Sequence, residues 1–308
     1  MEDRGVASSP KIGFNEPVIT HFPMATLLDG RVVSDFLLTQ VKEGVEKLKA
    51  DGVTPKLVVI VVGNNPASAV YVGKKEEACA KVGMLSERVS LPDTISQEEL
   101  LAKIEELNLD ASVTGMIVQL PLPRGIDPAK VIKAINPYKD VDGFQAYNVG
   151  KMFLSKEFED MSPCTPKGIT KILDYYKIDV GGLDCVVIGR SNIVGKPMAM
   201  MLLNRDATVT CCHSRTKNIR KYTKEADVIV VAVGKANFLT ADMVKEGAIV
   251  IDVGMNRLEN GTLCGDADFE GLKDKVAAIT PVPGGVGPMT VATLLSNTVT
   301  AAKKQANL

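Results

Sequence analysis

The alternation of continuous apolar runs with amphipathic segments constrains the fold of this chain more than any other feature. Residues 56–63 (KLVVIVVG) and 113–119 (VTGMIVQ) are apolar at most positions, which is typical of strands buried on both faces. Residues 35–50, 67–82 and 97–107 instead form helix-like segments, with apolar side chains at helical spacing in the first. Because parallel strands need a long crossover connection, strands alternating with helices predict a parallel sheet covered by helices.

The same alternation restarts after residues 162–166 (SPCTP), a segment with two prolines. Short strands are expected at 185–189, 208–212, 228–233 and 248–253, with helices near 196–204 and 217–224. A last helix is expected over about 291–305, and its apolar stripe needs a surface that the first half of the chain can supply. The length of 308 residues fits two such α/β domains.

Composition excludes several classes of function. Lysine and arginine total 36 against 37 aspartate and glutamate, so no strong basic field attracts nucleic acid. Six cysteines without C-x-x-C spacing and only two histidines argue against a metal site, and favour a reduced, cytoplasmic setting. No apolar run reaches the roughly 20 residues that span a membrane. Residues 1–23 lack periodicity and are interpreted as an extension, with Met24 a candidate natural start.

A glycine-containing turn connects the first strand of the second half to a helix. The segment is GRSNIVG, from Gly189 to Gly195, and it lacks the middle glycine of the G-x-G-x-x-G pattern. Gly189 permits a sharp turn, Gly195 permits close packing of helix on strand, and the helix N-terminus faces an anion. A plain tight turn has the same composition, but the position between a buried strand and a helix favours a dinucleotide site.

The end of the next strand favours NADP over NAD. NAD-binding proteins usually place a carboxylate here for the ribose hydroxyls, whereas this chain has His213, Ser214 and Arg215. Arg190 and Arg215 offer guanidinium donors for a 2′-phosphate, although Arg215 taken alone is equally well a solvated surface charge. Gly234 ends a further strand, where a cofactor can approach the backbone or where a turn simply needs glycine.

Tyr71 and Lys75 are candidates for chemistry because they lie four residues apart on a predicted helix and share one face. A lysine among apolar groups can have a lowered pKa and exchange protons. The spacing alone favours a surface lysine beside a tyrosine, and Lys74 is also near Tyr71. A short-chain dehydrogenase also uses Tyr-x-x-x-Lys, but there the pair follows the cofactor strands instead of preceding them.

Polar groups and glycines follow the strands of both halves. Pro121 ends the second buried strand, so Gln119 is expected at the sheet edge, where it either binds a ligand or Lys75 or merely ends the strand. Residues 140–143 (DVDG) form a turn whose carboxylates can cap amides or bind a heterocycle. Residues 283–288 (PGGVGP) indicate a ligand-contacting loop, with Thr290 as the N-cap of the last helix.

Together these segments resemble the bifunctional methylenetetrahydrofolate dehydrogenase/cyclohydrolase family over roughly residues 25–303. The resemblance is carried by long, ordered motifs: LLDG at 27–30, the spacing of Tyr71 and Lys75, VQLPL at 118–122, KDVDG at 139–143, PCTPKG at 163–168, GRSNIVG at 189–195 and TPVPGGVGPMT at 280–290.

The resemblance implies an α/β protein of two domains with a folate cleft between them. The catalytic domain would comprise residues 24–163 and 291–308, and a Rossmann-like NADP domain would comprise residues 164–290. The implied reactions belong to one-carbon metabolism: NADP-dependent oxidation of 5,10-methylenetetrahydrofolate to the methenyl cation, and hydrolysis of that cation to 10-formyltetrahydrofolate. Family members are commonly homodimers.

The resemblance also implies roles for single residues. Lys75 would transfer a proton in the hydrolysis, Gln119 would hold and tune Lys75, Tyr71 would pack on the folate, and Asp142 would bind the pterin. The implied cofactor contacts are Gly189, Arg190, Ser191, Gly195, Ser214, Arg215 and Gly234. The further implied substrate contacts are Val118, Leu120, Pro283, Gly284, Gly285, Val286 and Gly287.

Two alternatives stay open at this point. A dehydrogenase-only relative, perhaps one that uses NAD, is disfavoured by Ser214 and Arg215 at the cofactor strand. A sensor that binds NADP without turnover should have lost the catalytic lysine or glutamine, and this chain has both Lys75 and Gln119.

Overall fold

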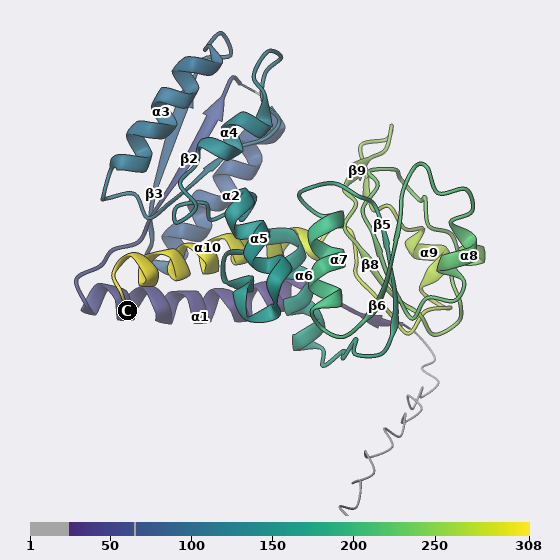
Figure 1. The fold of residues 1–308 in the computed structure, drawn as a ribbon. Helices are drawn as coiled ribbons and strands as arrows, with labels where there is room; N and C mark the ends of the chain where they lie inside the picture. The colour runs from purple at the N-terminus through teal and green to yellow at the C-terminus, as the bar shows by residue number, and fades with distance from the viewer. Residues whose placement is uncertain (1–24, 65) are drawn as a thin grey trace, which may run out of the picture.

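The computed structural model describes residues 25–64 and 66–308, which form two α/β units joined by long helices (Figure 1). The expectations for residues 1–23 and for Met24 lie outside the described residues. Strands pair in parallel throughout both main sheets, and this confirms the expected fold class.

The first unit is a sheet of three parallel strands in the order β3-β2-β4. The central strand β2 (Lys56–Val62) and its neighbour β4 (Gly115–Val118) are almost wholly buried, as their apolar runs predict. The edge strand β3 (Leu85–Leu91) is mostly exposed, so its sequence LSERVSL lacks that signature. The helices of this unit are α1 (Gly30–Ala50), α2 (Pro66–Val82), α3 (Gln97–Leu109) and α4 (Pro128–Ala134).

Local sequence explains where these helices form. In α1 the residues Val33, Leu37, Val41, Val45 and Leu48 recur at helical spacing and are buried. Helix α3 begins with a capping box, because the Ser96 hydroxyl accepts from the Glu99 amide while the Glu99 carboxylate accepts from the Ser96 amide. The segment between β3 and β4 therefore forms the crossover helix that a parallel sheet requires.

The second unit is a sheet of six parallel strands in the order β1-β11-β8-β7-β5-β6. The strands are β1 (Thr26–Leu27), β5 (Asp184–Ile188), β6 (Thr208–Cys212), β7 (Val228–Val231), β8 (Ile249–Asp252) and β11 (Ala278–Ile279). The helices are α7 (Gly195–Leu203), α8 (Arg220–Thr223) and α9 (Phe269–Leu272), with a short 3₁₀ turn η2 (Ala241–Met243). A small antiparallel pair, β9 (Asn256–Arg257) and β10 (Leu263–Cys264), lies beside this sheet.

Several elements connect the two units. Strand β1 pairs with β11 of the second sheet, although the chain then continues directly into α1. Three helical segments follow the first sheet: α5 (Ala146–Leu154), the 3₁₀ segment η1 (Lys156–Met161) and α6 (Cys164–Tyr175). Helix α6 contacts α1, α7 and α10 (Val286–Gln305). The division at residues 163–164 and 290–291 stays a prediction, since strands and helices cross it.

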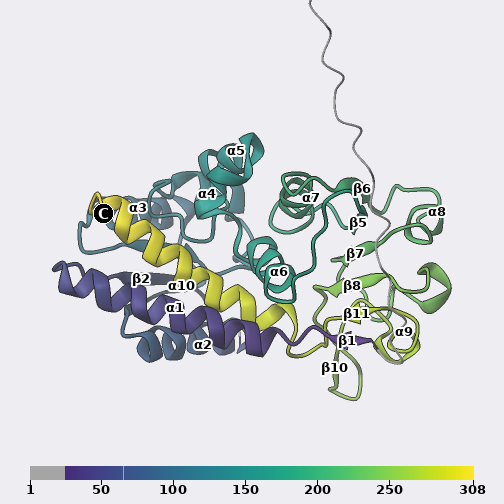
Figure 2. The same cartoon turned by 90° about the horizontal axis from the view of Figure 1, so that it is seen from below.

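Helix α10 returns the chain to the first unit, where it lies along α1 (Figure 2). It begins five residues before the expected start at 291, and its N-cap is Gly285. The expectation that Thr290 is the N-cap is wrong, because Thr290 lies inside the helix. Pro288 is tolerated in the first turn, where backbone N–H groups have no acceptor within the helix, so the helix starts inside the glycine-rich segment.

One buried amide fastens α10 to the loops of the first unit. Asn297 is fully buried, and its Nδ2 donates to the carbonyl oxygens of Val141 at 2.9 Å and Ser162 at 3.0 Å. Its Oδ1 accepts from Lys167 Nζ at 2.7 Å, and burial lowers the pKa of Lys167 to about 8. Asn297 therefore satisfies two buried carbonyls and one partly buried ammonium group at once.

Candidate active site

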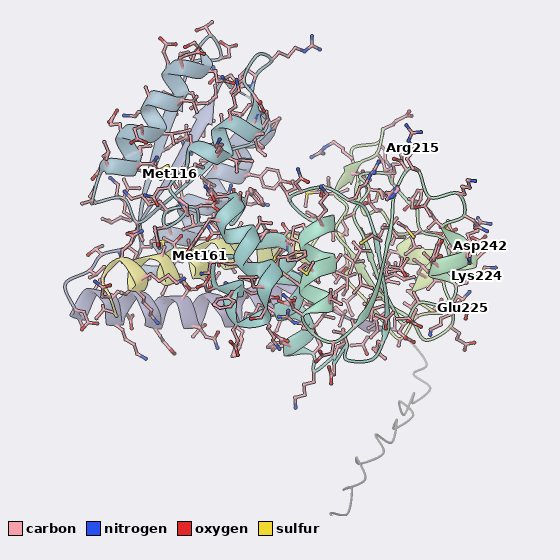
Figure 3. The ribbon with its side chains drawn as sticks, in the orientation of Figure 1. Met116, Met161, Arg215, Lys224, Glu225 and Asp242 are labelled. Carbon is pink, nitrogen blue, oxygen red and sulfur yellow. The ribbon has the colours of Figure 1, made fainter. Side chains whose placement is uncertain are left out.

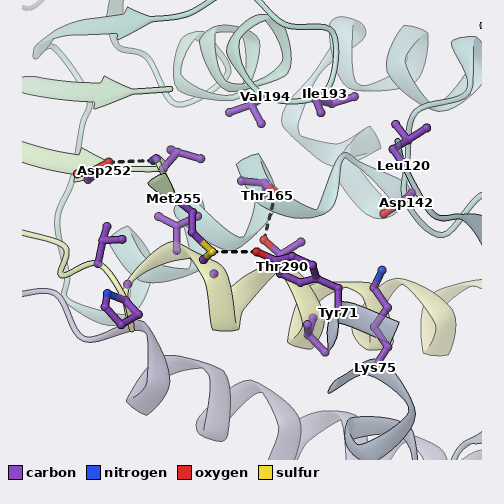
Figure 4. A pocket seen from close by; sticks show the side chains of 18 of the residues that line it. Tyr71, Lys75, Leu120, Asp142, Thr165, Ile193, Val194, Asp252, Met255 and Thr290 are labelled. Atoms are coloured by element: carbon purple, nitrogen blue, oxygen red, sulfur yellow. Dashed lines mark hydrogen bonds between the residues drawn. The ribbon is translucent and has the colours of Figure 1, made fainter. Parts of the chain in front are cut away.

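A cavity of about 430 Å³ lies where the two units meet (Figure 4). The first unit contributes Tyr71 and Lys75 from α2, the end of β4 and the loop that follows Val141. The second unit contributes the turn at 193–194, the end of β8 and the loop 281–287. The expected substrate residues all line this one cavity: Tyr71, Lys75, Val118, Gln119, Leu120, Asp142, Pro283, Gly284, Gly285, Val286 and Gly287.

Lys75 and Gln119 meet inside the cavity. Lys75 Nζ donates to Gln119 Oε1 at 2.7 Å, and Gln119 Nε2 donates to the carbonyl of Leu120 at 2.8 Å, so the amide is held in one orientation. Burial lowers the pKa of Lys75, while the negative charge of Asp142 opposes that shift. Lys74 is exposed and does not line the cavity, so the structure selects Lys75 from the two adjacent lysines.

The two carboxylates of the DVDG turn have different environments. Asp140 is buried and accepts from the backbone amides of Gly143 at 3.1 Å and Gln145 at 2.8 Å, and from Asn148 Nδ2 at 2.9 Å, so it holds the turn together. Asp142 lines the cavity. Burial raises the pKa of Asp142 to about 6 against the opposing effect of Lys75. The sequence left open which carboxylate caps amides, and Asp140 is the one that does so.

The lining residues that the sequence did not single out as substrate contacts include Thr165, Asp252, Met255 and Thr290. Tyr71 Oη donates to Met255 Sδ at 2.8 Å, a contact between the two units, and the hydroxyls of Thr165 and Thr290 lie 3.1 Å apart (Figure 4). Thr165 belongs to the PCTPKG motif and Asp252 ends an apolar strand, so a signal existed for both. Met255 had none, because its position depends on the approach of the two units.

The glycine-containing turn after β5 depends on close backbone contacts. A Cβ at Gly189, where φ is +135°, would lie 2.4 Å from the carbonyl oxygen of Ala232. A Cβ at Gly195 would lie 2.3 Å from the carbonyl oxygen of Gly189. The Ser191 hydroxyl accepts from the amides of Val194 at 3.1 Å and Gly195 at 3.3 Å, so it satisfies two backbone N–H groups just before and at the start of α7.

The remaining cofactor candidates lie along the carboxyl edge of the second sheet, outside the cavity lining. Strands β5 and β6 are paired in register, so Arg190 and the exposed Ser214 and Arg215 follow the ends of neighbouring strands. Arg215 lies on the second unit, far from Met116 of the first sheet (Figure 3). Two exposed guanidinium groups and a hydroxyl at this edge fit the 2′-phosphate of NADP. Gly234 follows β7 with φ of +66°.

In the part of the chain that the structure covers, every helix is too short or too polar to cross a bilayer.

Two family descriptions match this chain. Residues 28–142 match the catalytic domain of tetrahydrofolate dehydrogenase/cyclohydrolase, and residues 163–306 match the NAD(P)-binding domain of the same family. Among curated proteins, the bifunctional protein FolD of Campylobacter curvus is 56% identical over 280 residues, which cover 91% of this chain and 96% of that protein. The FolD protein of Helicobacter hepaticus is 53% identical over 90% of this chain and 96% of its own.

Solved structures are similar over the same length. The bifunctional FolD enzyme of Campylobacter jejuni is 52% identical, with a TM-score of 0.89 over 91% of this chain and 99% of that one. FolD of Trypanosoma brucei, solved with NADP and an inhibitor, is 35% identical, with a TM-score of 0.88 over 93% of this chain and all of that one. Matches at this identity and coverage settle the family: the chain belongs to the tetrahydrofolate dehydrogenase/cyclohydrolase family.

Proposed function

We propose that the protein oxidises 5,10-methylenetetrahydrofolate to the methenyl cation with NADP and hydrolyses that cation to 10-formyltetrahydrofolate. The observation that carries this proposal is the Lys75–Gln119 pair, which lies in a cavity whose opposite wall belongs to the NAD(P)-binding unit. A proton-transfer group and a redox surface in one cavity suit both reactions on one substrate. The bifunctional relatives and the NADP complex described above support the same conclusion.

For the oxidation, the chain mainly has to align the reactants. Bound at the second unit, NADP would supply the acceptor for the hydride of the methylene carbon. We assign the ring of Tyr71 to packing against the folate and the carboxylate of Asp142 to accepting from pterin N–H groups. The loop 281–287 and the end of β8 line the other side of the cavity and exclude water from it. A nitrogen lone pair of the substrate forms the methenyl cation, so no side chain needs to remove a proton here.

For the hydrolysis, water adds to the methenyl carbon and must lose a proton as the new C–O bond forms. Neutral Lys75 takes this proton and delivers it to the ring nitrogen whose bond to carbon breaks. Because burial lowers the pKa of Lys75, a larger fraction of the lysine is neutral than in water. Gln119 accepts one lysine N–H and so directs the lone pair toward the cavity. As that bond breaks, the hydroxyl group on the former methenyl carbon loses its proton to water and becomes the formyl carbonyl, so the sum of the steps consumes one water and releases one proton.

We also propose that the protein works in the cytoplasm as a homodimer, which the family resemblance implies. The cysteines of the described chain are free thiols, and this fits a reducing compartment. The near balance of charges gives no basic field for nucleic acid, so the partner is the small folate substrate. Sedimentation of the purified chain tests the dimer.

Replacement of Lys75 tests its role in hydrolysis. We expect Lys75→Met to slow hydrolysis of the methenyl substrate at least ~100-fold, because no other group replaces the proton acceptor. The Kd for NADP should stay within about twofold, since the cofactor binds the other unit. The matched control is Lys74→Met, which removes the neighbouring exposed charge and should hydrolyse at the wild-type rate. Hydrolysis that survives Lys75→Met intact would contradict the assignment.

The pH dependence of hydrolysis tests the electrostatics of the pair. The rate constant should rise with pH as Lys75 loses its proton, with a midpoint below the ordinary lysine pKa of 10.5. The negative charge of Asp142 raises the pKa of Lys75, so Asp142→Asn should move the midpoint to lower pH. Initial rates corrected for spontaneous hydrolysis give both profiles. A midpoint that moves upward in Asp142→Asn would show that Lys75 is not the titrating base.

Replacement of Arg215 tests the choice of cofactor. Arg215→Ala should raise the KM for NADP about tenfold relative to the KM for NAD, since a charge-assisted contact to the 2′-phosphate is lost. Lys224→Ala removes an exposed cation from the same unit and serves as the control. The measurement is the ratio of kcat/KM for the two cofactors. If the ratio changes equally in both variants, Arg215 acts only as a general surface charge and does not contact the 2′-phosphate.

A further inference from the structure

Two buried carboxylates of the second unit have been given no chemical role above, although Asp252 lines the cavity. Asp252 ends strand β8, and Asp266 follows strand β10; they are 3% and 0% exposed. Both accept several backbone hydrogen bonds near the carboxyl ends of β7 and β8, where a parallel sheet binds its ligands. A buried carboxylate is costly unless such donors surround it, so their arrangement needs an explanation.

Asp266 occupies a concave loop of backbone N–H groups. Its Oδ2 accepts from the amides of Val233 at 2.6 Å and Gly234 at 2.9 Å, and its Oδ1 accepts from the amide of Lys235 at 2.9 Å. Gly234 has a φ of +66°, in the left-handed region, which lets the three successive amides converge. Such a nest of amides binds anions, and in many proteins the anion is a phosphate. Here a side chain of the protein fills the nest.

Asp266 is itself held by neighbouring loops. Its backbone amide donates to Asp252 Oδ1 at 2.9 Å, and Asp252 also accepts from the amides of Gly254 and Ala267, each at 2.8 Å. Asn256 Nδ2 donates to Asp266 Oδ1 at 2.9 Å. These contacts join the loop after β7, the loop after β8 and the segment 265–267 into one assembly.

The glycines in this assembly leave no room for a side chain. A Cβ at Gly254 would lie 2.3 Å from Asp266 Oδ1, and a Cβ at Gly265 would lie 1.8 Å from Asp252 Oδ2. The carboxylates therefore rest directly against the backbone. Because Asp252 and Gly254 line the cavity, the assembly forms part of the cavity wall on the side of the second unit, where Figure 4 shows Asp252.

We propose that Asp266 is a positioning residue for NADP: as an internal anion it fixes the loop Val233–Lys235 in the conformation that the cofactor contacts. This inference rests on the proposed function, because it takes Gly234 as part of the cofactor site. Asp266 reaches the cofactor only through this loop and the segment after β8. Loss of its charge should therefore affect NADP binding and leave the folate chemistry of the first unit in place.

Asp266→Asn tests this separation. The amide keeps the shape of the side chain but turns one acceptor into a donor that faces backbone N–H groups. We expect the Kd and KM for NADP to rise about tenfold or more. Hydrolysis of purified methenyltetrahydrofolate, measured without NADP, should stay within about twofold of wild type and so report an intact fold. The control Asp274→Asn makes the same charge change at an exposed position and should leave the Kd unchanged.

Asn256→Ala provides a second, milder variant. It removes one donor to Asp266 without touching the three loop amides, and we expect a rise of about threefold in the Kd for NADP. If Asp266→Asn does not fold, the Kd of Asn256→Ala for NADP serves as the test. A raised Kd supports the proposal, and an unchanged Kd overturns it.

Two results with folded Asp266→Asn would also overturn it. One is an unchanged Kd for NADP, and the other is a fall of both activities by the same factor, which would indicate a purely structural role. Failure of the proposed function has a different signature, namely wild-type protein that binds NADP but turns over neither substrate. The Kd values of the variants would still decide the role of Asp266 in that case.

Discussion

The return of the last helix to the first unit is the constraint on which the rest of the structure depends. Helix α10 begins at the glycine-rich loop of the cavity and packs along α1, so one element belongs to both the site and the core. In its interior, Asn297 binds the carbonyls of Val141 and Ser162, which flank the segment 142–161 that begins with Asp142. Leaving such buried groups without partners costs about 1–3 kcal/mol each, so this amide holds the acidic loop firmly against the helix.

That arrangement lets one cavity combine two kinds of chemistry. The first unit supplies Lys75, Gln119 and Asp142. Burial shifts the pKa values of the two titratable groups in opposite directions: it lowers the pKa of Lys75 and raises the pKa of Asp142 to about 6. The second unit supplies the backbone wall against which a nicotinamide cofactor can be aligned. The substrate can stay in place between the two reactions, because the groups that we assign to each reaction face the same space.

Sequence patterns predicted the parts of the fold whose determinants are local. Strands β2 and β4 follow from continuous apolar runs, and the turn from Gly189 to Gly195 follows from its place between a strand and a helix. Strand β3 was missed because an exposed edge strand has no apolar run. Strands β1 and β11, of two residues each, exist only through pairing between distant segments. The start of α10 was misplaced because a first-turn proline resembles a loop.

The candidate site was predictable to a similar depth. The lining residues lay in motifs, but the choice between Lys74 and Lys75 needed either the family spacing or the observed contact with Gln119. The nest around Asp266 had no sequence signal, because its amides and its carboxylate come from distant parts of the chain. Gly234 and Asp266, for example, are 32 residues apart in the sequence. Contacts of that kind depend on tertiary packing and become visible only in the folded chain.

The central claim is that both reactions take place in the single cavity. The most direct test is inhibition by an unreactive tetrahydrofolate, such as one that carries an alkyl group on the ring nitrogen, measured in parallel for NADP reduction and for methenyl hydrolysis. One shared folate site predicts competitive inhibition of both reactions with inhibition constants that agree within about twofold. Constants that differ by tenfold or more, or inhibition of only one reaction, would mean that the two reactions use separate sites.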